Sequence, residues 1–439
     1  MAFTASITGI DNQRILEVAA TCRADGSIPS FTAEAGPLPY IGNHYTIYPV
    51  QYPDGTRVAV RVPIDIYSRD TLQTMLALMK AEANTLNLLA RCKFAWSPRV
   101  LYYTTTFDNP LGRPYMVCTW IDGKQLEWSE TFPAESENRQ KILAQVARIM
   151  FDLVVCTQKS GQRTTAESFM MFFIDYKMIG AIRGQLDGID PLSCLVLRLL
   201  ARRVTEGKCS SSTFAHSHEY LTSQNIIVDN NYNVKGFVDW GFARTLPIRF
   251  TLRFPRFLSI RAKSFPPDMP RDLCGYSKAF LQVSPAHKAD REFFISRIQY
   301  EFATRATKAS IGQLSPLGWE MMCWDLQDVD WKHLVYDAAT GMATHLWMSK
   351  RQFLVAGMSA CKTGSVSEIV TADALYQEIW AFFTRNQSKT THSDTQQRTV
   401  FLLQSAIAER LPWTLIKMML ENAFSVDQRL TGGESSSVP

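Results

Sequence analysis

The stretch TFAHSHEYLTSQNIIVDNNYNVKGFVDWGFA, residues 213–243, decides the fold of this chain. Within it, residues 226–229 and 234–238 are runs rich in β-branched side chains, which favour strands. The four residues between the runs, NNYN, include three asparagines, and asparagine tolerates the left-handed backbone that tight turns need. The pattern predicts a β-hairpin.

The open end of this hairpin carries two polar residues that suit a metal ion. Asn225 precedes the first strand and Asp239 follows the second, so antiparallel pairing places both at the same end. A neutral amide oxygen and a carboxylate suit Mg²⁺, which takes few protein ligands and leaves the rest to water and phosphate. An ordinary exposed hairpin with polar ends explains the same residues, because short motifs often match by accident.

The sequence of this stretch resembles a motif of the aminoglycoside phosphotransferase family, in particular of its divergent fungal members. The family typically reads His-Gly-Asp-Leu-x-x-x-Asn-Ile-Leu-Val-Asp, followed by Gly-x-Ile-Asp-Trp. The matching residues here are His218, Leu221, Asn225, Ile226, Ile227, Val228, Asp229, Gly236, Val238, Asp239 and Trp240. The resemblance implies a bilobal, protein-kinase-like α+β fold with a small antiparallel-sheet lobe and a larger, mostly helical lobe. It also implies that ATP and Mg²⁺ are used to phosphorylate a small-molecule acceptor, with Asn225 and Asp239 as the metal ligands.

The catalytic loop departs from the family pattern at two positions. Tyr220 stands where the family has the Asp that takes the acceptor's proton, and Glu219 replaces a small residue. General-base help is worth about a hundred- to ten-thousand-fold, and a free phenol, which ionises at about pH 10, does not supply it at neutral pH. Glu219 carries a carboxylate, but adjacent side chains of an extended loop point to opposite sides. His218, Glu219 and Tyr220 are therefore the candidate catalytic-loop residues.

The strand predicted over residues 56–62, TRVAVRV, supplies the small lobe with a cation. Its three valines share one face, and Ala59 and Arg61 share the other. By the resemblance, Ala59 lies against adenine and Arg61 reaches the phosphates, where the family usually has Lys. Arg keeps the charge and can fork onto phosphate or carboxylate, although its geometry differs from that of Lys. A solvated strand residue is the alternative for Arg61.

A helix beginning after Ser68 is predicted downstream of this strand. Its apolar positions follow helical spacing: Leu72, Met75, Leu76, Met79, Ala83, Leu86 and Ala90. Glu82 lies beside that stripe and matches the family's Glu that pairs with the phosphate-binding cation, here Arg61. An exposed helical Glu is the alternative.

Two further segments complete the expected nucleotide site. Residues 115–119 read as a buried strand, and the following WIDGKQL resembles the family's hinge, so backbone groups of about Val117, Thr119 and Trp120 would meet the adenine edge. GNHY, residues 42–45, lies where a phosphate-covering loop belongs, but Gly42 is its only glycine. Glycine lets backbone amides approach phosphate closely, and an uninvolved turn explains this segment equally well.

Three functions are open for such a chain. The first is an ATP-dependent small-molecule phosphotransferase with a weakened or altered general-base step. The second is a nucleotide-binding pseudokinase with a regulatory or scaffolding role. The third is the same fold repurposed to other chemistry, with Tyr220 as a proton donor or acceptor. The joint retention of Arg61, Glu82, Asn225 and Asp239 indicates that a nucleotide site is still in use, and we favour the first.

Composition limits the other classes of function. The 439 residues with 46% hydrophobic content can build sizeable cores, and the nine cysteines form no C-x-x-C pair, so neither zinc site nor disulfide framework is indicated. A net charge of +5 without a long basic run does not favour nucleic acid or an anionic membrane as partner. Without a signal-like or membrane-spanning apolar run, we expect a cytoplasmic protein with a small-molecule substrate and identify no protein partner.

The chain is expected to divide into an N-terminal extension, two lobes and a tail. The extension comprises residues 1–36, the small lobe 37–122, the helical lobe 123–426 and a disordered tail 427–439. The larger lobe holds the catalytic-like loop at 216–243 and several aromatic-rich helices. In the family such helices receive the acceptor, but aromatic stripes at helical spacing are more often core. Asp325, Asp328 and Asp330 could attract a cationic acceptor or form a solvated acidic turn.

Overall fold

The computed structural model describes most of the first 306 residues and a few later ones. The described residues are 10–33, 36–42, 44–64, 69–159, 164–182, 191–205, 213–259 and 284–306, with 335, 336, 339, 374, 377, 378 and 381. The predictions for Ser68, for the acidic residues at 325–330, for the helices after residue 306 and for the tail therefore lie outside the described residues.

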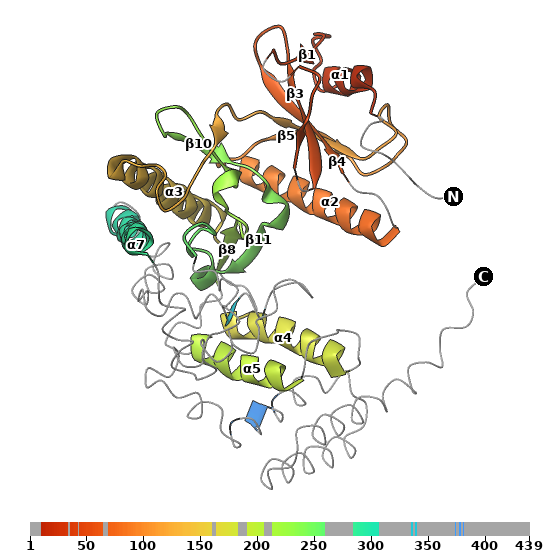
Figure 1. Cartoon of the computed structure of the whole chain (residues 1–439). Coiled ribbons are helices and arrows are strands. Elements are labelled where there is room, and N and C mark those ends of the chain that lie inside the picture. The colour runs from red at the N-terminus through yellow and green to blue at the C-terminus, as the bar shows by residue number, and fades with distance from the viewer. Residues whose placement is uncertain are drawn as a thin grey trace, which may run out of the picture.

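The small lobe is an antiparallel sheet of six strands with one helix on each face (Figure 1). Along the chain its elements are α1 Asn12–Ala20, β1 Ser30–Phe31, β2 Tyr40–Ile41, β3 Tyr45–Gln51, β4 Arg57–Pro63, α2 Arg69–Arg91, β5 Val100–Thr104 and β6 Tyr115–Thr119. The strands run β1-β3-β4-β6-β5, and β2 pairs with β3. The predicted strand at 115–119 and the predicted helix around Glu82 are confirmed.

The alternation in β4 divides the sheet as its sequence predicts. Val58, Val60 and Val62 are almost fully buried in an apolar cluster on the outer face. Ile15 and Val18 of α1 cover that cluster, so this helix, which lies in the segment expected to be an extension, packs on the small lobe. The opposite face of β4 carries Arg61 towards α2, and its neighbours there belong to the main core.

The larger lobe is built around one central helix. Its elements are β7 Lys124–Gln125, α3 Ser136–Thr157, α4 Ala166–Ile182, α5 Pro191–Thr205, β8 Phe214–Ser217, β9 Ile226–Val228, β10 Val234–Phe237, β11 Arg244–Pro247 and α7 Pro285–Ala306. Short 3-10 turns lie at Ser223–Asn225, Trp240–Phe242 and Ile248–Phe250. α3 buries a stripe formed by Ile142, Val146, Ile149 and Leu153, and α7 lies alongside it (Figure 1).

The predicted hairpin is present as β9 and β10, but its turn works differently from the expectation. The left-handed residue is Tyr232, with φ of 57°, and not an asparagine. The Asp229 carboxylate holds the turn instead, because it accepts hydrogen bonds from the backbone amides of Asn231 and Asn233, each at 2.9 Å. The Gln145 side chain of α3 then bonds both Val234 and Tyr232, which fixes the hairpin on the central helix.

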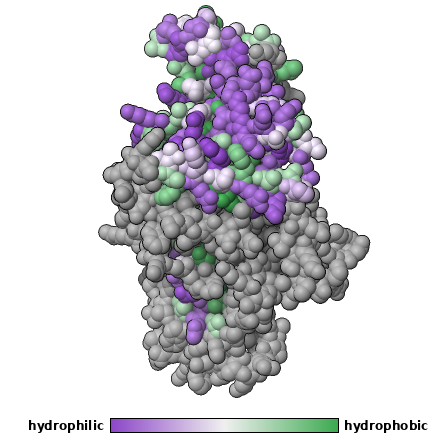
Figure 2. Space-filling model, turned by 90° about the vertical axis from the view of Figure 1, so that its left-hand side faces the viewer, coloured by the Kyte–Doolittle hydropathy of each residue, from purple (hydrophilic) through white to green (hydrophobic). Residues whose placement is uncertain are grey.

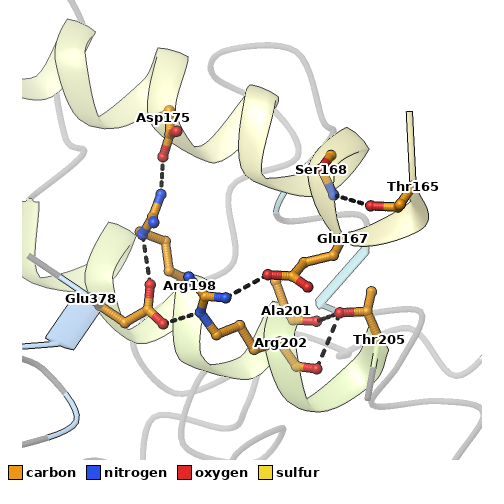
Figure 3. Close-up of polar contacts among 9 residues, drawn as sticks. All are labelled: Thr165, Glu167, Ser168, Asp175, Arg198, Ala201, Arg202, Thr205 and Glu378. Carbon is orange, nitrogen blue, oxygen red and sulfur yellow. Dashed lines mark hydrogen bonds and ion pairs between the residues drawn. The ribbon is translucent and has the colours of Figure 1, made fainter. Parts of the chain in front are cut away.

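A buried charge network joins α4, α5 and a residue from late in the chain (Figure 3). The Arg198 guanidinium lies between the carboxylates of Asp175 and Glu378, with 2.9 Å from Nε to Glu378. Arg202 binds the same Glu378 carboxylate and also Glu167. Each buried carboxylate in this network has a cationic partner, which is the condition for keeping such groups inside a protein.

These elements give an α+β fold of two lobes, a small antiparallel-sheet lobe and a larger lobe rich in helices, so the predicted fold class is confirmed. Among the residues that the structure describes, no helix has the length and apolar character to cross a membrane. The described upper part of the face in Figure 2 is largely hydrophilic, with hydrophobic residues in small separate groups.

Candidate active site

The predicted pair of Arg61 and Glu82 is formed. The Arg61 Nη1 and Nη2 atoms donate to the two Glu82 carboxylate oxygens, at 2.6 and 3.1 Å, and the Glu82 residue is 1% exposed. The Tyr45 ring lies 4.3 Å from the centre of the guanidinium. Burial alone would lower the pKa of Arg61, but the Glu82 carboxylate outweighs it and raises that pKa above its ordinary value. Arg61 is therefore a fixed cation on the inner face of the sheet.

The third nitrogen of the Arg61 guanidinium, Nε, is also buried. Its Nε has no hydrogen-bond partner within the described part of the chain. A buried donor without a partner is costly, so such an atom is explained best by a ligand that supplies an acceptor.

Glu82 also connects the small lobe to the segment after β10. The backbone amide of Trp240 donates to Glu82 Oε1 at 3.2 Å, the same oxygen that accepts from Arg61. The Trp240 side chain is fully buried and lies edge-on to Phe94, with 5.8 Å between ring centroids. Asp239, the residue before Trp240, is thus held at a fixed place relative to Arg61.

Asn225 and Asp239 lie next to each other at the open end of the hairpin, as predicted. The Val238 amide donates to the Asn225 carbonyl oxygen at 2.9 Å, which places Asp239 one residue beyond that contact. Asn225 Nδ2 donates to the Tyr220 carbonyl oxygen at 2.9 Å, so its Oδ1 remains an acceptor. Asp239 adopts a left-handed conformation with φ of 65°.

This donor set fits Mg²⁺. Within the described residues, the Asp239 carboxylate has neither a hydrogen bond nor an ion pair, and no cluster of three or more acidic, His or Cys side chains offers a metal site. One carboxylate and one amide oxygen are few ligands, which suits a cation that keeps several waters and binds phosphate oxygens.

His218 is buried and supports the catalytic-like loop. Its Nε2 lies 2.9 Å from the Val238 carbonyl oxygen, so Nε2 carries the proton and Nδ1 is left as an acceptor. Nδ1 is buried without a partner among the described residues, and burial lowers the pKa of His218 to about 4. A neutral imidazole whose ring packs 4.5 Å from that of Trp240 supports the loop and does not reach solvent.

The Glu219 carboxylate is held by two arginines of the larger lobe. The backbone of Glu219 has φ of 61°, a conformation that a small residue adopts more easily, and its side chain is buried. Arg253 Nη2 donates to one carboxylate oxygen at 2.7 Å, and Arg244 and Tyr336 donate to the other at 2.9 to 3.1 Å. This setting does not favour Glu219 as a substitute for the missing base.

Tyr220, in contrast, faces solvent and is 39% exposed. Its ring lies 5.6 Å from the Phe242 ring, and the Arg256 guanidinium lies 5.6 Å from its centroid. Phe242 in turn lies 5.7 Å from the imidazole of His44 in the small lobe. Sequence reasoning missed Phe242 and His44 as neighbours of Tyr220, because their contact depends on how the two lobes meet.

The expected adenine-binding residues lie along β4 and β6. Ala59 is buried opposite Cys118, but the Val117 side chain belongs to the outer cluster and does not face the cleft. The amides of Thr119 and Trp120 already donate to the carbonyls of Arg99 and Arg57. Adenine recognition by this segment would therefore use backbone groups that these bonds leave available.

The segment after β6 packs directly on the hairpin of β9 and β10. Gly123, with φ of 143°, lies so close to β9 that a Cβ atom there would be 2.5 Å from the Val228 carbonyl oxygen. A Cβ at Gly236 would lie 2.7 Å from the side chain of Ile121. Both glycines are needed for close approach, and they place the expected hinge against the hairpin.

Gly42 closes the turn between β2 and β3. Its amide donates to the Tyr45 carbonyl oxygen at 2.9 Å, which makes a tight turn at the predicted phosphate-covering position. Separately, a cavity of about 40 Å³ lies behind the catalytic loop, lined by His218 and Glu219 but not by Tyr220. Arg61, Glu82, Asn225 and Asp239 are absent from the lining of that cavity.

Comparisons with known proteins give one match to a family model. Residues 48–250 match the model of a family described as the phosphotransferase enzyme family. No curated protein matches the sequence.

Several solved structures are similar to this chain at low identity. They include a streptomycin–ATP–APH(2″)-IIa ternary complex, with 11% identity, 75% of this chain and 92% of that chain covered, and a TM-score of 0.39. An ADP-bound aminoglycoside phosphotransferase APH(2″)-Ib has 12% identity, 81% and 98% coverage and a TM-score of 0.39. Macrolide 2′-phosphotransferase MphH from Brachybacterium faecium has 12% identity, 70% and 96% coverage and a TM-score of 0.36. Residues 48–250, less than half of the chain, are thus similar to the phosphotransferase enzyme family.

Proposed function

We propose that this chain is an ATP- and Mg²⁺-dependent phosphotransferase that acts on a hydroxyl group of a small molecule. One observation carries the proposal. A single Glu82 carboxylate oxygen accepts from both Arg61 and the Trp240 amide, and this supports a site in which Arg61 binds phosphate close to Asn225 and Asp239. A structural ion pair alone would not explain why Arg61 Nε is left without a partner among the described residues.

Each group has a role in this proposal. Arg61 binds phosphate oxygens through Nε and the guanidinium hydrogens that Glu82 does not use. Asn225 Oδ1 and the Asp239 carboxylate hold the metal ion, which neutralises phosphate charge when bound. The backbone after β6 meets the base, and the turn at Gly42 covers the phosphates. His218 holds the Val238 carbonyl, and thereby the backbone just before Asp239.

The acceptor proton is the step in which this chain differs from its family. Tyr220 offers a phenol, and the Glu219 carboxylate is taken by Arg244 and Arg253. Positioning and charge neutralisation contribute more to phosphoryl transfer than a general base does, so loss of a carboxylate base slows the reaction without abolishing it.

A second candidate function is nucleotide binding without phosphotransfer, in a regulatory or scaffolding role. The observation that favours it is the same engagement of Glu219, because no other carboxylate of the described catalytic loop, residues 216–225, can replace the missing Asp. The two candidates share the nucleotide site and differ only in turnover.

Thermal unfolding with ATP and Mg²⁺ tests the shared nucleotide site. A ligand that binds only the folded protein stabilises it by about 2.7 kcal/mol at a hundred times its dissociation constant. We expect a metal-dependent stabilisation that Asp239→Asn removes and that Asp108→Asn, a matched change on an exposed loop, leaves intact. No stabilisation at millimolar ATP and Mg²⁺ would refute both candidates, and formation of ADP separates them.

A further inference from the structure

Two exposed aromatic rings stand beside the proposed metal ligands. The Tyr220 and Phe242 residues are 39% and 37% exposed, and their ring centroids are 5.6 Å apart. Large aromatic side chains are normally buried, and adjacent exposed rings are a common feature of binding sites. Their shared position therefore calls for a ligand that covers them.

The backbone fixes both rings to the site. The Tyr220 carbonyl oxygen accepts from Asn225 Nδ2, and Phe242 ends the short turn that begins directly after Asp239. The His44 ring, from the small lobe, lies 5.7 Å from Phe242 on the other side. Tyr220, Phe242 and His44, which we call the aromatic platform, thus lie beside the backbone that carries Asn225 and Asp239, the proposed metal ligands.

The charges around the platform disfavour a cationic acceptor. The Arg256 guanidinium already lies 5.6 Å from the centre of the Tyr220 ring, where it uses the ring's attraction for cations. The loop carboxylate of Glu219 is buried and bound by Arg253 and Arg244. Among the described residues, a polycationic sugar would meet a cation and aromatic rings at the platform, and the nearby Asp239 carboxylate is assigned to the metal ion.

We propose that the acceptor is a planar aromatic molecule whose reacting group is a phenolic hydroxyl; this rests on the phosphotransferase function proposed above. The platform supplies ring stacking, and the missing loop carboxylate selects the hydroxyl. A phenol ionises at about pH 10, whereas an aliphatic alcohol is far less acidic, so the phenol depends much less on a general base. Tyr220 in place of the family's Asp adds an aromatic ring and removes a base. Both effects suit a phenolic substrate.

The reaction balances without a further reactant. The phenolic oxygen forms a bond to the γ-phosphorus of ATP, and its proton passes to water. The bond between that phosphorus and the oxygen that bridges to the β-phosphate breaks, and ADP leaves with the electron pair. The product is an aryl phosphate.

Three probe alcohols separate the two parts of the proposal. They are 2-naphthol, 2-naphthalenemethanol, which keeps the rings but has an aliphatic hydroxyl, and decahydro-2-naphthol, which keeps the size but has no aromatic ring. Binding is measured by ligand-observed NMR with the full chain, Mg²⁺ and a non-hydrolysable ATP analogue. We expect the two aromatic probes to bind about two- to tenfold more tightly than the saturated one, which is the scale of one aromatic contact.

The rate of phosphate-ester formation with ATP then tests whether the reacting hydroxyl is phenolic. We expect 2-naphthol to be phosphorylated at least about a hundredfold faster than 2-naphthalenemethanol. General-base catalysis is worth at least about a hundredfold, and the aliphatic alcohol needs a base that the loop does not supply. Equal rates, or faster reaction of the aliphatic alcohol, would overturn the phenolic assignment. Equal binding of the saturated and aromatic probes would overturn the platform.

Two matched variants assign the binding to the platform. Phe242→Leu removes one ring and keeps an apolar side chain, and it should reduce the preference for aromatic probes to near unity. Phe107→Leu alters a phenylalanine that is 43% exposed in the loop between β5 and β6, and it should leave the preference unchanged. If ATP and Mg²⁺ stabilise the chain but Phe242→Leu changes nothing, the aromatic acceptor is refuted while the phosphotransferase stands; if they do not stabilise it, the phosphotransferase itself fails.

Discussion

Replacing Glu82 by glutamine tests the central contact of the site. Glu82 is 1% exposed and accepts three hydrogen bonds, two from the Arg61 guanidinium and one from the Trp240 amide. Glu82→Gln keeps the shape but leaves the Arg61 charge buried without a counterion. Removing one partner of a buried ion pair costs about 3 to 5 kcal/mol, so we expect that loss in the free energy of unfolding.

Urea unfolding measures this loss. With a slope of about 3 kcal/mol per molar urea, the midpoint should fall by about 1 M or more. Glu137→Gln, the same substitution at an exposed position in the first turn of α3, should change the free energy by less than about 0.5 kcal/mol. The double variant Arg61→Met with Glu82→Leu removes both charges, so it should recover most of the stability, less about 1 kcal/mol for the Trp240 amide left without its acceptor.

The double variant should nevertheless show no stabilisation by ATP and Mg²⁺. If Glu82→Gln unfolds at the same urea concentration as wild type and Glu137→Gln, the pair is not the buried contact described here. If the double variant still responds to nucleotide, Arg61 is not a phosphate ligand.

Two further outcomes are expected, one from pH and one from the loop. Burial lowers the pKa of His218 from 6.5 to about 4, so the unfolded chain binds more protons between these values, and stability should fall by about 3 kcal/mol from this residue as the pH drops from 6.5 to 4. Urea titrations across that range should show a shallower pH slope for His218→Gln, and an unchanged slope would contradict the assignment. Tyr220→Asp restores the family's carboxylate, so turnover of ATP with an aliphatic alcohol should rise by about a hundred- to ten-thousand-fold, whereas Tyr220→Phe should give no such gain. A folded, nucleotide-binding Asp variant no faster than the Phe variant would show that Tyr220 is not simply a missing base.

Local sequence patterns were sufficient to predict features that depend on a single strand or helix. The alternation in residues 56–62 predicted which face of β4 carries Arg61, and the helical spacing around Glu82 predicted α2. The contact between these two residues could be predicted from the resemblance, since strand and helix are neighbours in that fold.

The remaining features depend on partners that a local pattern does not reveal. Asp229 holds the hairpin turn through its carboxylate, which allows Tyr232 to take the left-handed conformation that an asparagine was expected to take. The Glu219 carboxylate is engaged by Arg253, which lies 34 residues further along the chain. The Trp240 amide reaches Glu82 only once the two lobes have met. Each of these contacts joins distant segments, so neither propensity nor periodicity carries a signal for it.

The helix α1 has a practical consequence for anyone who shortens this protein. It supplies Ile15, Val18 and Ala19 to the cluster over the outer face of the sheet. A polypeptide starting at residue 37 would keep every residue proposed here for the nucleotide site, yet it would present the valine row of β4 to water. Exposed apolar sheet faces promote self-association. Such a fragment would fail by precipitating rather than by losing a ligand, and its insolubility would say nothing about the chemistry of the cleft.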